Sequence, residues 1–566
     1  MGESRRTPRT ATTRRTRGRA VAALTAAALL LSSCSPGESG TEAPATPEQP
    51  ANTQYFGYQV NQRLVTTNAG SIDGVANNAE VLAGRLYPSV YVPGPAGEMI
   101  PNTDLATAQA LPGKQRQVVY TLNADASYSD GEPITCVDFL LAHTAGTMTS
   151  LFDSHLPMMQ QIERIDCDAG DRQFTAVFAP GDGGRWRQVF GPGTVMPAHT
   201  IARKAGMSLA ELSDALHARD AAALAEVARI WNEGFALDSF DPELQVSSGP
   251  YVLSEVGPQG EAVLTRNQNY YGDPAHQDTI VVWPESADSR ELAELGALRI
   301  ADVENAEPEF IDRDDASNPY TVESRVGDLT ESLKISQTGV LGQPWAREAF
   351  AACVDQNWAA AVSSQLSGVE VPPVATQVVT HFDPMRRHVA DISDTHLAID
   401  HDKARALNGT TIRIGYNGPD ERKAAMVDVI AASCGDAGIT VEDAASDGTS
   451  VKDLGRITTG QWGEDVYSEG TIDAFLGAVD PMSEYGAVSA RDSDVSEIRE
   501  AETRAWEELN YIPLAAQPRS FVIDDRVGNV VAYTGLAGIG WNMDRWNVRN
   551  ENGKTADGTA EPAEQG

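Results

Sequence analysis

The residues of this sequence best suited to distinctive chemistry are its five cysteines, Cys34, Cys136, Cys167, Cys353 and Cys434. A cysteine thiol can be acylated, oxidised to a disulfide or used as a metal ligand, and its surroundings decide between these fates. No C-x-x-C occurs and the spacings match no zinc motif, so a cysteine-bound metal is not expected. Cys34 differs from the other four because of the segment that precedes it.

Cys34 ends an N-terminal segment with the parts of an export signal: arginines at the start, then an apolar run, then small residues at a cleavage site. The apolar run, Ala20–Leu31, is shorter than the roughly 20 residues that a membrane-spanning helix needs. Because Leu31-Ser32-Ser33 directly precedes the cysteine, we expect residues 1–33 to be a lipoprotein signal peptide and Cys34 to be lipidated. The alternative is an ordinary secretory signal with an incidental cysteine. The Arg-Arg pairs leave open whether export is Sec or Tat.

Two segments have a composition that is typical of disorder. Residues 34–53 are rich in Pro, Ser, Gly, Glu and Thr and offer little apolar surface to offset their ordering entropy. They are expected to form a flexible tether between the lipid and a folded body. Residues 549–566 have the same character and predict a disordered tail.

The bulk composition bounds the classes of partner. With 566 residues, the chain is long enough for two or three units with cores of their own. Its formal net charge of -37 argues against nucleic acid and against electrostatic binding to anionic lipid, since both need a basic surface. Once Cys34 is lipidated, four cysteines remain in an oxidising compartment, where three disulfide connectivities can form. Four free thiols are the alternative.

Catalytic motifs are missing from the sequence. It contains no G-x-S-x-G, H-E-x-x-H or G-x-x-x-x-G-K-[ST]. His381, His388, His396 and His401 lie in one region, but their spacing suits no single helical face, so a solvated loop is expected rather than a metal site. A large exported body without a catalytic frame favours a binding protein, with no metal and no cofactor.

The elements that would position a binding site are of mixed type. Gln117–Asn123 alternates like a strand, and Thr135–Asp138 has capping-box spacing before an apolar run, which predicts a helix start. Two runs after Gly249 predict a β-hairpin, and residues 343–362 predict one helix with an apolar face. A short helix is expected at residues 401–407. Farther on, a strand at Thr411–Asn417, a helix over Ala424–Cys434 and a strand from Ile439 predict a parallel βαβ unit in an α/β fold.

Five segments together resemble the extracellular solute-binding proteins of ABC importers, in the peptide/oligopeptide- and nickel-binding family. Residues 118–142 resemble the family's strand, "F-x-D-G-x-P-x-T-A-x-D-V" turn and helix, with Tyr128 and Cys136 in place of Phe and Ala. Residues 247–272 resemble "GTGPY…L-x-R-N-x-x-Y", and residues 345–362 resemble "R-x-A-x-x-x-A-I-D-R". Residues 400–409 resemble "D-x-x-K-A-x-x-L-L", and residues 510–517 resemble the "P-x-I-P-L" strand. The matches run in the family's order over most of residues 54–548.

The resemblance implies an α/β, two-lobed, periplasmic-binding-protein-like fold with an extra subdomain inserted in the first lobe. The lobes would be joined by a two-strand hinge and close over a ligand. The expected boundaries are residues 54–85, 195–300 and 515–548 for lobe I, residues 86–194 for the inserted subdomain, and residues 301–514 for lobe II. On these boundaries, Cys136–Cys167 and Cys353–Cys434 are the favoured disulfides, since each pair falls within one lobe and leaves the hinge free.

The resemblance also implies the ligand-binding residues. Asp480, in IDAFLGAVDP, falls at the position of the family aspartate that binds a peptide's α-ammonium, although Gly477 replaces the usual Trp; capping of a turn before Pro481 is the alternative role. The backbone of Gly477, Ala478 and Val479 would pair with the peptide as an added strand. Trp462 and Tyr485 are aromatic candidates for the pocket, with a core role as the alternative, and Arg456 is a candidate for the ligand's carboxylate by position alone.

The sequence therefore predicts a monomeric, non-enzymatic substrate-binding lipoprotein on the outer face of the bacterial cytoplasmic membrane. It would capture peptides and deliver them to the transmembrane subunits of an ABC permease. The alternatives are a nickel chelate, glutathione or an oligosaccharide as ligand, or, from another class, a cell-surface enzyme or sensor lipoprotein. Ligand length and side-chain preference are not predicted.

Overall fold

The computed structural model describes residues 52–95, 97–459, 465–486 and 495–548. The predicted signal peptide, Cys34, all but the last two residues of the tether, Trp462 and the predicted tail lie outside the described residues. Among the described residues, no helix is both long and apolar enough to cross a membrane.

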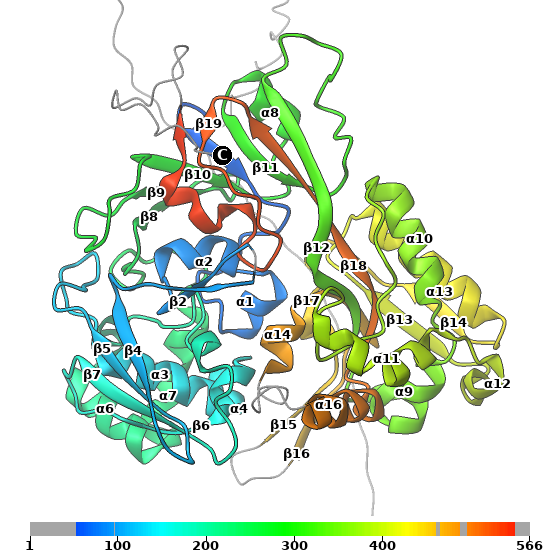
Figure 1. The fold of residues 1–566 in the computed structure, drawn as a ribbon, viewed down its shortest axis with the longest axis horizontal. Helices are drawn as coiled ribbons and strands as arrows, with labels where there is room; N and C mark the ends of the chain where they lie inside the picture. Colours follow the sequence, from blue (N-terminus) through cyan, green and yellow to red (C-terminus); the bar gives the residue numbers. More distant parts are fainter. Residues whose placement is uncertain (1–51, 96, 460–464, 487–494, 549–566) are drawn as a thin grey trace, which may run out of the picture. The chain divides into compact units, whose positions relative to one another are not determined.

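A ten-stranded mixed sheet runs through the body, in the order β14-β13-β17-β12-β18-β11-β1-β10-β9-β8. Two of its strands are unusually long, β12 (Tyr320–Ile335) and β18 (Tyr511–Asp524). They pair antiparallel from Tyr320↔Asp524 to Lys334↔Tyr511. At one end β18 pairs with β11 (Leu298–Val303), and at the other end β12 pairs with β17 (Ala474–Val479). The two strands therefore join both halves of the sheet, and Figure 1 shows them side by side between the halves.

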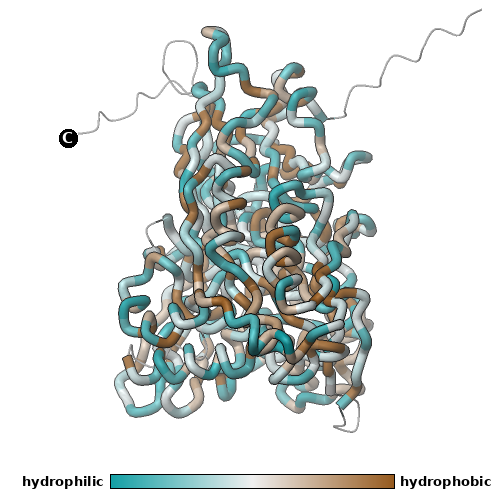
Figure 2. Tube along the Cα trace, turned by 90° about the vertical axis from the view of Figure 1, so that its right-hand side faces the viewer, coloured by the Kyte–Doolittle hydropathy of each residue, from teal (hydrophilic) through white to brown (hydrophobic). Residues whose placement is uncertain are grey.

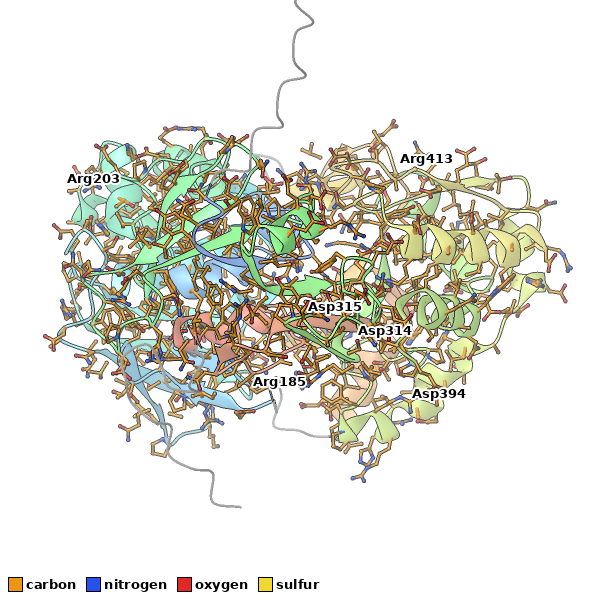
Figure 3. The ribbon with its side chains drawn as sticks, turned by 90° about the horizontal axis from the view of Figure 1, so that it is seen from above. Arg185, Arg203, Asp314, Asp315, Asp394 and Arg413 are labelled. Atoms are coloured by element: carbon orange, nitrogen blue, oxygen red, sulfur yellow. A yellow bond between two sulfur atoms is a disulfide. The ribbon has the colours of Figure 1, made fainter. Side chains whose placement is uncertain are left out.

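Two large hydrophobic cores define the lobes. The lobe I core is built from residues between Phe56 and Ile300 and from residues between Phe521 and Trp546. The lobe II core is built from residues between Leu333 and Leu514. Apolar segments gather inside the chain trace and polar ones lie on its outer loops (Figure 2). Seen from above, Arg203 of lobe I and Arg413 of lobe II lie on opposite sides (Figure 3). The two-lobed α/β fold predicted from the sequence is thus present.

A second sheet of lobe I has four antiparallel strands in the order β4-β5-β7-β6. The strand predicted at Gln117–Asn123 is β5, Gln117–Leu122. Helix α3 (Cys136–Thr147) begins at the predicted capping box, in which the Asp138 carboxylate accepts the backbone N–H of Thr135 at 2.8 Å. The remaining strands of this sheet are β4 (Ala106–Leu111), β6 (Ile162–Asp166) and β7 (Gln173–Phe178).

Lobe II contains the predicted βαβ unit. Strand β13 (Thr411–Gly415) is followed by helix α13 (Glu421–Gly435) and by strand β14 (Thr440–Asp443), which pairs parallel with β13. In lobe I the predicted hairpin is formed by β8 (Tyr251–Val256) and β9 (Ala262–Arg266), which pair antiparallel. The short helix expected at residues 401–407 consists of an α-helical turn, α12 (His401–Ala404), and a 3-10 turn, η6 (Arg405–Leu407).

The single helix predicted over residues 343–362 is wrong. The structure has two helices, α9 (Pro344–Ala351) and α10 (Gln356–Ser367). Asp355 starts the second helix as its N-cap, since its carboxylate accepts the backbone N–H of Trp358 at 2.9 Å. An aspartate favours a cap over a helix interior because it hydrogen-bonds nearby backbone groups, and the apolar periodicity alone did not reveal this break.

Two disulfides lie in separate cores. Cys136, the first residue of α3, is bonded to Cys167, just after β6, and Cys353 is bonded to Cys434 of α13. These are the two pairs that the sequence favoured, although Cys353 lies in the turn between α9 and α10 rather than in a helix. Each bridge stays within one lobe, so neither crosses from lobe I to lobe II.

The remaining helices and strands complete the two lobes, with β1 and β10 in the ten-stranded sheet. In lobe I they are β1 (Phe56–Gln59), α1 (Ile72–Ala76), α2 (Glu80–Leu86), β2 (Tyr91–Pro93), β3 (Met99–Pro101), α4 (Thr149–Phe152), η1 (Pro157–Gln161), η2 (Trp186–Gln188), α5 (Ala198–Lys204), α6 (Leu209–Ala218), α7 (Ala221–Glu233), β10 (Thr279–Trp283), α8 (Ser289–Glu294), β19 (Val527–Gly528), η8 (Ile539–Arg545) and β20 (Asn547–Val548). In lobe II they are η3 (Gly339–Gly342), η4 (Pro384–His388), α11 (Ala390–Ser393), η5 (Asp394–Leu397), η7 (Val451–Asp453), β15 (Arg456–Thr459), β16 (Asp465–Ser468), α14 (Pro481–Glu484) and α16 (Val495–Glu508).

Candidate ligand-binding cleft

A cavity of about 580 Å³ lies between the lobes. This volume falls in the range of pockets that enclose small-molecule ligands. Lobe I contributes α1, the start of α2 and the β2–β3 hairpin to its walls, and lobe II contributes β17, α14 and the adjoining part of β12. The cavity is thus located where a hinged two-lobe protein encloses its ligand.

The backbone of Gly477, Ala478 and Val479 lines this cavity. On one side these residues pair with Ser332, Glu331 and Thr330 of β12. On the other side the pairing of β17 with β13 is confined to Ala474 and Phe475. Within the described parts of the chain, no strand pairs with residues 477–479 on that second side. A short strand edge is therefore open to the cavity, and such an edge can hydrogen-bond an extended ligand.

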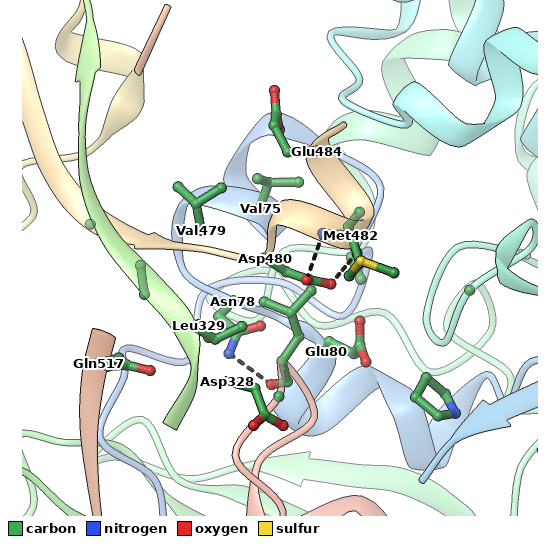
Figure 4. Close-up of a pocket in the computed structure, with 18 of the residues that line it drawn as sticks. Val75, Asn78, Glu80, Asp328, Leu329, Val479, Asp480, Met482, Glu484 and Gln517 are labelled. Carbon is green, nitrogen blue, oxygen red and sulfur yellow. Dashed lines mark hydrogen bonds between the residues drawn. The ribbon is translucent and has the colours of Figure 1, made fainter. Parts of the chain in front are cut away.

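Asp480 directly follows this open edge and is the N-cap of α14. Its carboxylate accepts the backbone N–H of Met482 at 2.9 Å and the hydroxyl of Ser483 at 2.6 Å, as Figure 4 shows for the cavity wall. Burial raises the pKa of Asp480, and the hydrogen bonds from Ser483 and Met482 and the charge of Arg185 oppose this rise. Asp480 thus caps a turn and also lines the cavity, so its two alternative roles are compatible in one geometry.

Two further carboxylates lie beside Asp480, and the sequence did not single them out. Glu80 is the first residue of α2, and Asp328 lies in β12 at an irregularity of the β12–β18 pairing. Burial and then the charge of Asp480 raise the pKa of Glu80 to about 8. Burial likewise raises the pKa of Asp328. The hydrogen bond with Thr534 opposes this rise, and the charge of Asp480 adds to it. Glu80, Asp328 and Asp480, here called the carboxylate cluster, share one wall of the cavity (Figure 4).

The carboxylate cluster has the electrostatics of a cation site. Like charges that are brought together in a partly buried place raise one another's pKa values, and an added cation reverses that effect. Among the described residues, none of the three carboxylates is within ion-pair distance of a lysine or arginine. Arg185 acts on Asp480 from farther away, and its guanidinium donates to the Met482 sulfur at 3.0 Å. An ammonium group from a ligand would complete this arrangement.

Most of the cations in the cavity wall already have a carboxylate partner. Arg422 donates to both oxygens of Glu331, at 2.5 and 2.7 Å. The other pairs are Lys423–Asp420, Arg519–Asp302 and Arg63–Asp447. Lys334 differs, because no carboxylate of the described residues lies within 4.0 Å of its ammonium. That ammonium lies over the ring of Tyr511, 5.3 Å from its centroid.

The other residues proposed from the sequence lie outside the main cavity or outside the described chain. The Tyr485 hydroxyl donates to Gln377 at 2.8 Å, and the ring contacts Tyr511 edge to face. Arg456 forms an ion pair with Asp153 of lobe I at 3.1 Å. Trp462 is not among the described residues.

Contacts between the lobes border the cavity. Lys452 of lobe II pairs with Asp73 of lobe I at 2.6 Å. The Glu484 carboxylate contacts Nε2 of His155 at 2.6 Å. Burial alone would raise the pKa of Glu484, but His155, Lys334 and a hydrogen bond from Tyr511 lower it to about 2. The structure therefore holds the lobes together through charged contacts at the rim of the cavity.

The four histidines that lie close in sequence do not form a metal site. The His396 ring stacks on Trp506 with 3.6 Å between centroids, and His401 contacts the Ser433 carbonyl at 3.1 Å. His381 packs against Phe382, and His388 contacts Arg387. In the described chain, no group of three or more His, Cys, Asp or Glu residues could hold a metal ion. The solvated loop expected here is wrong, because short helices η4, α11 and η5 fold it back onto α16.

Comparison with known proteins identifies the class. The family model for bacterial extracellular solute-binding proteins, family 5 Middle, matches residues 101–484. The chain therefore belongs to this family of binding proteins, which are not enzymes.

Two relatives and two solved structures show the range of the likeness. An uncharacterized lipoprotein of Mycobacterium tuberculosis is 28% identical over 86% of this chain and 92% of its own length. The oligopeptide-binding protein OppA of the same species is 29% identical over 43% of this chain and 37% of its own. A Thermus thermophilus oligopeptide-binding protein complexed with a pentapeptide has a TM-score of 0.65 at 14% identity, covering 88% of this chain and 97% of that one. NikZ from Campylobacter jejuni in complex with Ni(L-His) has a TM-score of 0.60 at 12% identity, covering 87% and 99%.

Proposed function

We propose that this protein is the lipid-anchored substrate-binding component of an ABC importer that captures peptides between its two lobes. The open edge of β17, directly beside the carboxylate cluster, is the observation that supports a peptide best. A peptide laid along Gly477–Val479 would form backbone hydrogen bonds as an added strand. Its α-ammonium would then enter the carboxylate cluster, with Asp480 at its centre. The closed form would deliver the peptide to the transmembrane subunits of a permease.

Binding a peptide as an added strand suits a carrier that accepts peptides of many sequences. Backbone hydrogen bonds are the same for every peptide, so they contribute affinity without selecting side chains. A charge-assisted hydrogen bond to an ammonium is about twice as strong as a neutral one and fixes the direction of the chain. Water between side chains and the cavity wall would accommodate different residues.

The charge of the cavity bears on the alternative ligands. NikZ was solved with Ni(L-His), which carries no net negative charge, so the charge of the cavity does not disfavour a chelate of that kind. An anionic chelate placed here would meet the carboxylate cluster, while the described arginines of the wall are already paired. Desolvating like charges against each other is unfavourable. The cavity therefore favours a ligand with a cationic group over an anionic metal chelate.

The proposed lipid anchor is inferred from the N-terminal segment. Lipidation of Cys34 would hold the protein at the outer face of the cytoplasmic membrane, with residues 34–53 as the tether. The likeness to mycobacterial lipoproteins, over 86% of this chain, supports this placement. We expect a monomer, because capture and delivery require only one two-lobed chain.

The test is to identify the ligand directly. The protein is purified without denaturation, and small molecules released from it are identified by mass spectrometry. Peptides should be recovered, and small-angle scattering should show compaction when they are added back to stripped protein. Recovery of a chelate or sugar, with no compaction by peptides, would contradict the proposal. Turnover of an added peptide, lost on one substitution in the cleft, would instead favour a cell-surface enzyme.

A further inference from the structure

A half-buried lysine with no ion-pair partner among the described residues distinguishes the second end of the cleft. Lys334 lies near the end of β12 and lines the cavity. Its neighbours Leu333 and Ile335 point into the lobe II core. Because successive side chains of a strand alternate between faces, the side chain of Lys334 is directed to the cavity by the same pattern that buries its neighbours.

The ammonium of Lys334 is held in place without being neutralised. It lies 5.3 Å from the centre of the Tyr511 ring, a cation–π contact that positions the charge. Glu484 is the nearest acidic influence on it, but the Glu484 carboxylate is engaged by Nε2 of His155 at 2.6 Å and by Tyr511. Burial lowers the pKa of Lys334, and Glu484 only partly opposes this effect. Because this half-buried charge has no ion-pair partner among the described residues, it would stabilise an incoming anion.

The register of the sheet places this charge relative to the carboxylate cluster. Lys334 is opposite Phe475, which lies five residues before Asp480 along β17. Five residues of extended chain span about 17 Å at roughly 3.4 Å per residue. The open edge of Gly477–Val479 lies between these two positions. The cavity thus has the carboxylate cluster at one end and Lys334 at the other, joined by a strand edge.

We propose that Lys334 binds the terminal carboxylate of the ligand, and that the separation between Lys334 and Asp480 selects peptides of about four residues. This inference rests on the proposed function and makes it more specific, because it assigns the ligand's orientation and length. The amino end would lie at the carboxylate cluster, and the carboxyl end would lie over Tyr511 beside Lys334. Peptides that are too short would reach only one of the two charges.

The test uses alanine peptides of two to six residues, measured by calorimetry against wild type, Lys334→Met and the control Lys114→Met. Lys114 lies in the exposed loop between β4 and β5 and is not among the residues that line the cavity. Tetra-alanine should bind wild type best, and amidation of its C-terminus should weaken binding roughly tenfold, the loss of one charge-assisted hydrogen bond. Lys334→Met should weaken the free peptide by a similar factor and make amidation neutral. Lys334→Arg should retain most of the affinity.

The outcomes separate this inference from the proposed function. If peptides bind but amidation weakens them equally in wild type and Lys334→Met, the carboxylate lies elsewhere and Lys334 has no such role. Equal affinity for all five lengths would overturn the length selection. If no free peptide of any length binds wild type, the proposed function itself fails. Circular dichroism of each variant verifies that the fold is retained, and Lys334→Gln takes the place of Lys334→Met if that variant does not fold.

Discussion

Two groups of charges in the cleft wall show opposite ways of burying a carboxylate. Glu331 and Arg422 are both buried and form a two-pronged ion pair, to which Ser363 adds a hydrogen-bond acceptor at 3.1 Å from Arg422. The carboxylate cluster holds three acidic groups without a lysine or arginine at ion-pair distance among the described residues. The first arrangement is complete within the chain. The second needs a cation from outside, and it lies beside the open edge of β17.

This difference separates charges that stabilise the fold from charges that would bind the ligand. A buried ion pair adds little over a well-packed apolar pair, but removing one partner leaves an uncompensated charge and is costly. A partly buried carboxylate without an ion-pair partner is destabilised in the ligand-free state, and a bound cation would relieve this effect. Substitutions in the first group should therefore change stability, and substitutions in the second should change binding.

The largest expected effect is on stability, from Arg422→Met. Glu331 would stay buried without its partner, so the free energy of unfolding should fall by about 3–5 kcal/mol. Urea unfolding followed by tryptophan fluorescence measures it. The double variant Arg422→Met with Glu331→Gln should regain much of the loss, since no buried charge remains. A single variant as stable as wild type would show that water reaches Glu331 and that the pair is not structural.

The next effect is on binding, from Asp480→Asn. Asparagine caps a helix as well as aspartate does, so α14 should be retained while the negative charge is lost. The affinity for a peptide with a free amine should fall about 10- to 100-fold, the value of a charge-assisted hydrogen bond. Asp220→Asn is the matched control, because Asp220 caps α7 on an exposed surface. Equal affinities in wild type and Asp480→Asn would remove the amine anchor, and N-acetylated peptides should bind both proteins equally weakly.

A smaller effect should appear in the pH dependence of binding. Since the pKa of Glu80 is about 8 in the ligand-free protein, Glu80 is largely protonated at pH 6.5. A bound ammonium favours the ionised form, so affinity should rise with pH toward 8 and fall once the peptide amine, with a pKa of about 7.7–8.0, loses its proton. Glu80→Gln should abolish the rising limb and leave the falling one. A rising limb that persists in Glu80→Gln would assign the titration to another group.

The raised pKa of Glu80 also affects the stability of the ligand-free protein. A carboxyl group whose pKa is raised on folding binds its proton more tightly in the folded state than in the unfolded one. The stability that it contributes is present below the unfolded pKa, near 4.5, and is lost as the pH rises toward 8. Glu80→Gln should therefore stabilise the ligand-free protein more at pH 8 than at pH 5, which thermal unfolding at the two values measures.

The sequence predicted those parts of the fold that local patterns encode. The capping box at Thr135 and the βαβ unit from Thr411 to Asp443 were found because their signals lie within one element or between neighbouring elements. The break between α9 and α10 was missed because one aspartate cap outweighed an apolar pattern that continues through it.

Local sequence patterns predicted less of the candidate binding site. Asp480 could be named from a motif, but Glu80 is 400 residues away and Asp328 is 152 residues away in the chain. They meet only because the β12–β18 pair brings the lobes together, and neither residue stands in a distinctive local pattern. Lys334 could not be singled out from the sequence either, because it differs from the other cations of the wall only in having no carboxylate of the described residues within 4.0 Å of its ammonium.

The smallest expected effect concerns the contacts between the lobes. Lys452–Asp73 and Arg456–Asp153 join lobe II to lobe I at partly exposed positions, with about a third of each side chain accessible. Exposed ion pairs contribute roughly 0–1 kcal/mol each and are screened by salt. Lys452→Met should therefore shift the ligand-free protein only slightly toward an open form, with a slightly larger radius of gyration in small-angle scattering. Added peptide should restore the closed form, because on the proposed binding mode the ligand would bridge both lobes through the carboxylate cluster. High salt should reproduce the effect in wild type and add nothing in the double variant Lys452→Met with Arg456→Met. A large opening from Lys452→Met alone would mean that the rim contacts, rather than the ligand, control closure.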